Sequence, residues 1–214
     1  MSETTGNWAD QAEAKVLDAA LPLAAEMGWT ALLVARAAKE AGLSAADAEL
    51  LLPGGPRDLA ALFSRRCDAA MTGALKDTDP RGLKMRDRIG RAVQARLEAA
   101  AETEAATRRW AGFLALPANA ALALRLQWES ADLIWRWAGD TATDENHYSK
   151  RAILSAILGS ALMVRLASGR AKSDAYVSAR IGDVMSFEKF KAGLPKVDLM
   201  GAAAGLLGKL RYGG

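Results

Sequence analysis

The sequence predicts an all-α protein, and its composition is the main reason. The chain of 214 residues contains 47 alanines and 29 leucines, against seven valines and five isoleucines. Alanine and leucine favour helices, whereas β-branched residues favour strands. Hydrophobic residues make up 51% and charged residues 25% of the chain, as in a globular protein that can bury its own core.

The N-terminal part predicts three helices. Apolar residues recur at helical spacing over residues 8–27, and a second helix is predicted over 30–41, with Thr30 as its N-cap. Ser44 is placed to cap a short third helix, and Asp47 holds the acidic position of a capping box.

The rest of the chain predicts longer helices, separated by proline, glycine or short polar turns. They are expected at about 57–77, 83–101, 104–115, 118–138, 144–168 and 173–191, followed by a separate segment at 194–210.

Several functional classes find no support in the residues. The single cysteine, Cys67, excludes an internal disulfide framework, and the single histidine, His147, argues against a zinc site. We find no catalytic constellation and no phosphate-binding glycine loop, so we expect a non-enzyme without metal or cofactor.

The N-terminus is polar and lacks the pattern of a signal peptide, and no apolar run looks long enough to span a bilayer. These features favour a cytoplasmic protein.

Charge is unevenly distributed along the chain. Residues 1–56 carry a net charge of −5, whereas residues 57–214 carry +8, giving +3 overall. The acidic N-terminal part should therefore repel polyanions.

The same N-terminal part is similar to the three-helix domain of TetR-type regulators. Residues 16–20, 28–30 and 37–44 carry the resemblance, with 41–44 as the turn of a helix-turn-helix. A recognition helix needs basic or amide side chains, but residues 45–52 offer only Asp47 and Glu49 as polar groups. We therefore expect no DNA partner. A ligand-responsive repressor is the alternative, and a regulator that lost DNA binding but kept another small ligand is a third possibility.

The densest group of unusual residues spans 132–151, here called the signature segment. A helix ends near Gly139, a short polar loop follows, and a new helix begins near Asp144. Capping, plus an ion pair from Asp144 to Lys150 or Arg151, would explain two or three of these residues but not the whole group.

The signature segment resembles that of the coenzyme Q biosynthesis lipid-binding family, the ninth protein of the Coq series. Residues 53–59, Phe63 with 65–71, 84–89 and 180–189 also fit, so that the resemblance covers about 15–210. It implies a TetR-like fold, a homodimer, an apolar pocket for isoprenoid lipids, and association with the membrane-associated hydroxylase that acts on demethoxyubiquinone. The implied partner-binding residues are Asp144, Asn146, His147, Tyr148, Lys150 and Arg151. The family commonly has tryptophan where this chain has His147, which makes the aromatic anchor smaller.

The residues themselves give a weaker case for a lipid pocket. Several helices are apolar on more than one face, and small residues at 155–161 could leave room for a chain. Such stripes more often form plain core, and sequence does not separate a filled core from a cavity. The candidate lipid-binding residues, for an isoprenoid quinone or a phospholipid, are Met85, Ile89, Val93, Trp110, Phe113, Leu114, Leu126, Leu133, Ile153 and Ile157.

The C-terminal segment predicts an amphipathic helix. Its apolar arc includes Leu199, Met200, Leu206, Leu207 and Leu210, and Lys196 and Lys209 are among the flanking basic residues. Such a segment suits an anionic membrane surface, so we expect a protein peripheral to the inner (cytoplasmic) membrane. The alternative is a tail that docks on its own core or on a dimer mate.

These observations divide the chain into four parts. We expect a disordered N-terminus at 1–7, a helix-turn-helix-like subdomain at 8–55, a helical lipid-binding and dimerisation bundle at 56–192, and a membrane-associating helix and tail at 193–214.

Overall fold

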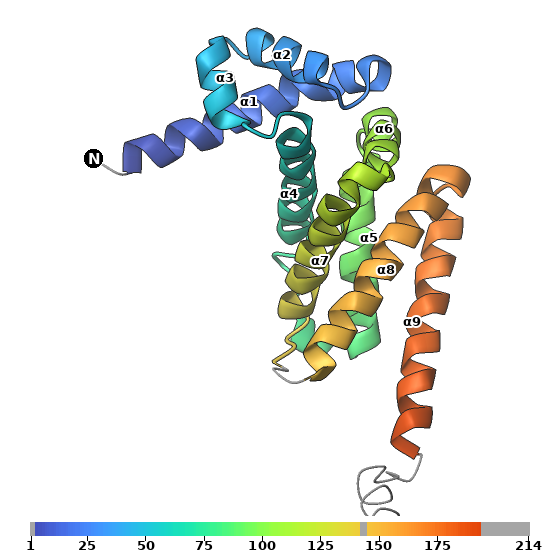
Figure 1. The fold of residues 1–214 in the computed structure, drawn as a ribbon. Coiled ribbons are helices and arrows are strands. Elements are labelled where there is room, and N and C mark those ends of the chain that lie inside the picture. Colours follow the sequence, from blue (N-terminus) through green and yellow to red (C-terminus); the bar gives the residue numbers. More distant parts are fainter. Residues whose placement is uncertain (1–2, 142–144, 194–214) are drawn as a thin grey trace, which may run out of the picture.

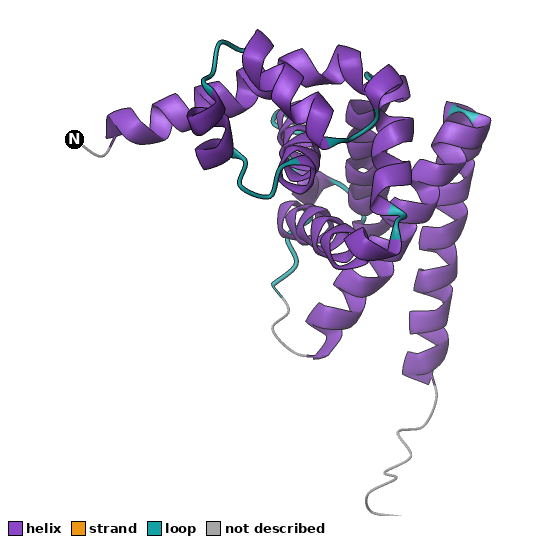
Figure 2. Cartoon of the chain, turned by 45° about the horizontal axis from the view of Figure 1, so that its top comes forward, coloured by secondary structure: helices purple, strands orange, loops and turns teal. Residues whose placement is uncertain are grey.

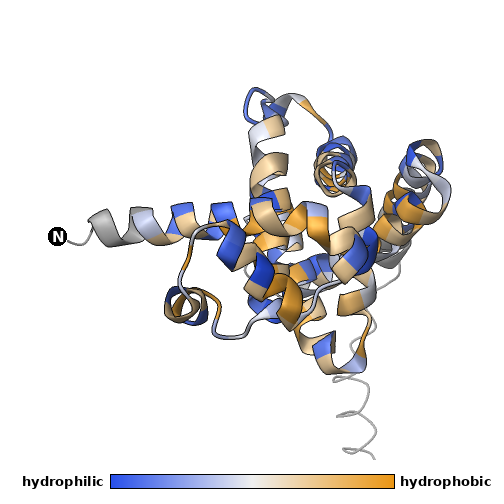
Figure 3. Ribbon diagram, turned by 90° about the horizontal axis from the view of Figure 1, so that it is seen from above, coloured by the Kyte–Doolittle hydropathy of each residue, from blue (hydrophilic) through white to orange (hydrophobic). Residues whose placement is uncertain are grey.

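The computed structural model describes residues 3–141 and 145–193, with side chains described for 8–141 and 147–184. Over these residues the regular secondary structure is helical throughout (Figure 2), which confirms the all-α prediction. The helices carry hydrophobic and hydrophilic segments side by side (Figure 3), as expected where each helix buries one face.

Three helices, α1 (Glu3–Met27), α2 (Ala31–Glu40) and α3 (Ala45–Leu51), lie across one end of the molecule (Figure 1). The hydroxyl of Thr30 accepts a hydrogen bond from the Leu33 amide at 3.2 Å and caps α2. The hydroxyl of Ser44 accepts from the Asp47 amide at 3.1 Å and donates to the Asp47 carboxylate at 2.6 Å. Both predicted N-caps are thus confirmed, and Asp47 has a capping role.

The N-terminal boundary differs from the prediction. We expected residues 1–7 to be disordered, but α1 already begins at Glu3. No proline precedes Trp8, and Gly6 costs a helix only about 1 kcal/mol, so the local sequence contains no strong stop.

The remaining helices form a bundle (Figure 1). They are α4 (Pro56–Ala74), α5 (Met85–Ala101), α6 (Glu104–Leu114), α7 (Ala120–Trp137), α8 (Glu145–Ser168) and α9 (Arg170–Gly193), with 3-10 turns at Pro80–Gly82 and Pro117–Asn119. α8 packs against α5, α7 and α9, and α9 lies at the outer edge against α5 and α8. Three N-terminal helices followed by a larger bundle are compatible with a TetR-like arrangement.

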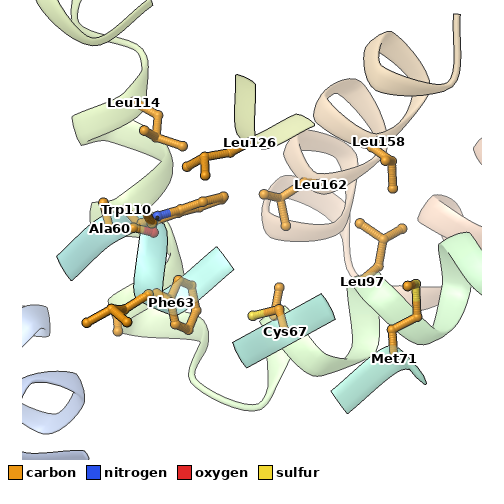
Figure 4. Close-up of a cluster of buried hydrophobic side chains, with 14 of the residues drawn as sticks. Ala60, Phe63, Cys67, Met71, Leu97, Trp110, Leu114, Leu126, Leu158 and Leu162 are labelled. Atoms are coloured by element: carbon orange, nitrogen blue, oxygen red, sulfur yellow. Dashed lines mark hydrogen bonds between the residues drawn. The ribbon is translucent and has the colours of Figure 1, made fainter. Parts of the chain in front are cut away.

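One buried core joins the two parts. Phe63 of α4 lies between Trp29 and Trp110, with ring centroids 5.5 Å from each. The Trp29 indole donates to the Ala106 carbonyl at 3.1 Å, and the Trp110 indole donates to the Ala60 carbonyl at 3.0 Å. Figure 4 shows Phe63 and Trp110 beside the aliphatic side chains of the bundle. The N-terminal helices are therefore fixed on the bundle by shared packing.

The same bundle contains a buried ion pair. The Arg96 guanidinium donates to the Asp68 carboxylate at 2.6 Å and to the Ser64 hydroxyl at 3.1 Å. The Ser130 hydroxyl donates to the same carboxylate at 2.7 Å. The pair links α4, α5 and α7, and its hydrogen bonds offset the cost of burying two charges.

One apolar stretch is longer than we expected. Residues His147–Ser168 of α8 are long and apolar enough to cross a membrane by length and composition alone. The expectation rested on uncharged runs, and Arg151 and Arg165 interrupt this one. Packing of α8 against three other helices accounts for the apolar side chains on its inner face.

Candidate functional site

The connection from α7 to α8 begins with a helix end that is capped from another helix. Gly139 has φ +86°, a left-handed conformation that glycine adopts without strain. The Arg88 guanidinium of α5 donates to the Ala138 carbonyl at 2.7 Å and to the Leu83 carbonyl at 2.9 Å. A β-carbon at Gly139 would lie 3.5 Å from this guanidinium. The end of α7 is thus held against the start of α5.

A charged network then fixes the start of α8. The Arg151 guanidinium donates to the Asp132 carboxylate at 2.6 Å and to the Asp140 carboxylate at 3.2 Å. The Lys150 ammonium donates to the other oxygen of Asp140 at 2.8 Å. Burial raises the pKa of the Asp140 carboxyl, but its hydrogen bonds and proximity to Lys150 and Arg151 outweigh burial and hold that pKa below its usual value.

Trp135 connects this network to the interior. Its indole donates to the Lys150 carbonyl at 3.2 Å, and the Lys150 ammonium lies 5.4 Å from the centroid of its ring. Charge pairing and an aromatic ring therefore hold the end of α7 against the start of α8.

The partner-binding candidates differ in how far they are exposed. Tyr148 is 64% exposed, and its ring lies 6.2 Å from Trp128 and 5.2 Å from His147. Lys150 is half-buried, whereas Arg151 is only 2% exposed and does not form part of the surface. Asp144 and the side chain of Asn146 lie outside the described residues.

An apolar cavity of about 240 Å³ lies behind this segment, between α5, α7, α8 and α9. Most of its lining side chains are hydrophobic, and two positive side chains stand among them. The lining residues are Met85, Arg86, Ile89, Trp135, Ser149, Lys150, Ile153, Leu154, Ile157, Ile181 and Val184. Such a space suits an apolar chain whose polar end remains near the cations.

Four of the ten candidate lipid residues line this cavity: Met85, Ile89, Ile153 and Ile157. The structure places the other six elsewhere. Val93, Trp110, Leu114 and Leu126 are buried in the core, Phe113 packs partly buried against it, and Leu133 is 39% exposed.

Sequence reasoning missed several lining residues. Ile181 and Val184 sit three residues apart on α9, a helical spacing that could have indicated an inward face. The sequence indicated Trp135 only as a member of the signature segment and not as a residue that lines a cavity. Its position between the ion network and the cavity depends on how α7 and α8 pack.

The candidate membrane-binding residues Leu199, Met200, Leu206, Leu207, Leu210, Lys196 and Lys209 lie outside the described residues. Over the described part of the chain, no group of three or more histidine, cysteine, aspartate or glutamate residues is arranged to hold a metal ion. Cys67 is buried, and burial raises the pKa of its thiol.

Comparison with known proteins identifies relatives. A model of the COQ9 family matches residues 120–188, which include α7, the whole signature segment and the cavity-lining part of α8 and α9. The ubiquinone biosynthesis protein COQ9 of Xenopus tropicalis is 31% identical over 168 residues, covering 73% of this chain and 51% of that protein. The human protein of the same name is 30% identical over 164 residues, covering 73% and 51%.

The Bos taurus protein of this name is 29% identical over 187 residues, covering 83% of this chain and 58% of that protein. All three relatives are named as mitochondrial. The chain spans about half the length of the curated relatives it matches. The segment that the family model matches includes the Asp140–Arg151 network and eight of the eleven residues that line the cavity. The chain belongs to the COQ9 family.

Proposed function

We propose that this protein is a non-catalytic, isoprenoid-lipid-binding accessory protein of ubiquinone biosynthesis. It would hold a demethoxyubiquinone-type intermediate and present it to the membrane-associated hydroxylase that acts on it. The names of the relatives support the pathway. The apolar cavity behind the signature segment is the observation that supports lipid binding.

The cavity wall has the chemistry that an isoprenoid chain requires. A chain that contacts Ile89, Ile153 and Ile157 would have its apolar surface removed from water. Such burial stabilises a complex by about 25 cal/mol per Å² of buried ligand area. Lys150 and Arg86 stand in the same lining and supply polar contacts for a ring or head.

A cavity-filling variant tests lipid binding. Ile157→Trp should occupy the space and weaken binding of a short-chain ubiquinone by about tenfold or more, because overpacking removes the room for the chain. Leu32→Trp, at a position 69% exposed on α2, is the matched control and should bind as the wild type does. Binding is measured by titration calorimetry. Equal affinity in both variants, or no quinone bound by the wild type, would overturn the proposal.

The exposed side of the same helical turn is the proposed partner surface. Tyr148 stands out beside Trp128 and His147, and exposed aromatic side chains are common interface anchors. In this proposal Arg151 acts from inside by holding Asp132 and Asp140, and Lys150 positions the turn.

Quinone profiling tests the partner surface. Deletion of the gene should lead to accumulation of a demethoxy intermediate, and the wild-type gene should clear it. Tyr148→Ala should fail to restore the profile, whereas Leu116→Ala, at a site 52% exposed elsewhere, should restore it. An unchanged quinone pool in the deletion strain would contradict the pathway itself.

We propose a homodimer that uses the outer face of α7 and α8. α8 is apolar, yet only 39% of its most hydrophobic window is buried within the chain. Leu124 and Met163 are 72% and 58% exposed there, and Ala152 and Ala156 are exposed on the same helix as Met163. A second copy would cover this face symmetrically.

Light scattering tests the dimer. Met163→Asp should give monomers, whereas Leu116→Asp should leave the dimer intact. A monomeric wild type would overturn this assembly.

We further propose that the protein lies peripherally on the cytoplasmic face of the inner membrane through residues 194–214. The amphipathic pattern and positive flanks of this segment support the proposal. The full chain should float together with anionic liposomes, whereas a form that ends at Ala192 should stay behind in the unbound fraction. Equal flotation of the two forms would refute it.

A TetR-type repressor is the alternative function. The third helix argues against it, since Glu49 is exposed, Asp47 caps the helix, and residues 45–52 contain no basic group. A low-salt anisotropy titration should detect no sequence-specific DNA complex, and tight sequence-dependent binding would favour the repressor.

A further inference from the structure

The apolar cavity is closed at its inner end. The last lining residues at this end are one isoleucine from each of three helices: Ile89 on α5, Ile157 on α8 and Ile181 on α9. One helical turn away on the same helices, the side chains are fully buried and do not line the cavity. They are Val93, Ala161 and Val177, each with 0% exposure. Packed core therefore forms the floor of the cavity.

Two close approaches between helices hold this inner end shut. The Ser173 hydroxyl of α9 donates to the Ala161 carbonyl of α8 at 3.2 Å, and both residues are fully buried. A β-carbon at Gly90 of α5 would lie 3.7 Å from the Ile181 Cδ1 atom, so α9 lies close against α5 beside the cavity. A ligand chain that reaches the three isoleucines is therefore stopped there.

The opposite end of the cavity is open to solvent. Ile153 lines it and is 36% exposed, and Arg86 and Ser149 are exposed lining residues as well. Along α8 the lining extends from Ser149 to Ile157, which is about 12 Å at a helical rise of about 1.5 Å per residue. The enclosed path between the opening and the floor is thus short.

Length and volume give the same capacity for an isoprenoid chain. An isoprene unit adds four carbon–carbon bonds of about 1.5 Å to the chain and advances it by about 5 Å, so about 12 Å accommodates two units. An apolar cavity of about 150 Å³ accepts the six carbons of benzene, so one of about 240 Å³ has room for about ten carbons. Ten carbons are again two isoprene units.

We propose that the cavity encloses two isoprene units and leaves the rest of a longer polyprenyl chain outside the bundle. The proposal rests on the proposed lipid-binding function and deepens it, because it defines how much of the chain the protein shields from water. Ile89, Ile157 and Ile181 determine this length, since their side chains set the depth of the cavity.

The test measures affinity against chain length. Ubiquinones with zero, one, two and four isoprene units are titrated into the full-length protein, each below its solubility limit. Quenching of tryptophan fluorescence reports binding, because Trp135 lines the cavity. Each of the first two units should tighten binding about tenfold or more, since each buries several methylene-sized groups. The two further units should together add less than about threefold.

Variants assign the length limit to the floor. Ile89→Phe adds volume at the inner end and should abolish the gain from the second unit while keeping the gain from the first. Ile181→Phe adds the same volume from α9 and should give the same result, so the test does not depend on one variant folding. Ala179→Phe is the matched control, because Ala179 is exposed on α9 and does not line the cavity. It should retain both gains.

The outcomes separate this proposal from the lipid-binding function. An affinity that keeps rising by the same factor through four units overturns the length limit and leaves lipid binding standing. The limit is also wrong if both phenylalanine variants at the floor retain the gain from the second unit, or if the control loses it. Failure of every ubiquinone to bind the wild type counts against lipid binding itself.

Discussion

The guanidinium of Arg151 donates a hydrogen bond to the carboxylate of Asp140 at 3.2 Å, although the two residues stand on opposite sides of the connection between α7 and α8. Both side chains are almost fully buried, with 3% and 5% exposed. A charge pair in this position ties the end of one helix to the second turn of the next. It therefore determines the shape of the surface that carries Tyr148 and of the wall that contains Trp135.

Removal of the arginine should destabilise the protein strongly. Arg151→Met removes the buried cation that bridges Asp132 and Asp140, and breaking a buried pair costs about 3–5 kcal/mol of unfolding free energy. Arg136→Gln removes a partner of Asp132 that is 70% exposed, and should cost less than about 1 kcal/mol. Urea unfolding measures both. Similar losses in the two variants would show that burial does not set the strength of this network.

Asp140 should make stability depend on pH in the acid range. Its pKa is lowered in the folded protein, so its contribution is complete above the unfolded value of about 3.9 and is lost as pH falls through the lower folded value. Asp140→Asn should therefore be less stable than the wild type at pH 7, and this difference should disappear in acid. Asp183→Asn, at an exposed site on α9, is the control and should give a small difference. If the stability difference between the wild type and Asp140→Asn stayed constant down to pH 2, the Asp140 carboxylate would not be the source of the pH dependence.

Phe63 should be essential to the packing of the N-terminal helices on the bundle. Phe63→Ala removes the ring between Trp29 and Trp110 and should cost about 3–5 kcal/mol. Leu32→Ala changes an exposed side chain and should stay within about 0.5 kcal/mol of the wild type. Tryptophan fluorescence during urea unfolding reports both. A separate early transition of the N-terminal helices in the wild type would mean that the shared core does not couple the two parts.

Cys67 should report on opening of the core. Its thiol is 2% exposed, and burial raises its pKa, so the reactive thiolate is scarce in the folded state. Labelling by a thiol reagent should be slow in buffer and become fast in denaturant. Ser168→Cys introduces a second thiol at an exposed position, which should label at once. Rapid labelling of Cys67 in the native wild type would reveal frequent local opening of α4.

The sequence alone determined the helical class, the predicted caps at Thr30 and Ser44, and the approximate extents of the helices between 57 and 193. These features depend on local propensity, capping and periodicity, which nearby residues decide. The signature segment was also recognisable as a unit, because its residues are close together in the chain.

Tertiary structure decided which of those residues face the surface, the core or a cavity. Arg151 and Tyr148 are three residues apart, yet one is buried in an ion network and the other is exposed. Ile89 and Val93, one helical turn apart on α5, are both buried in the core, yet only Ile89 also lines the apolar cavity. Whether a residue is exposed, buried in the core or at a cavity depends on how helices that are distant in sequence pack together. Helical periodicity repeats identically along each helix and does not encode this packing.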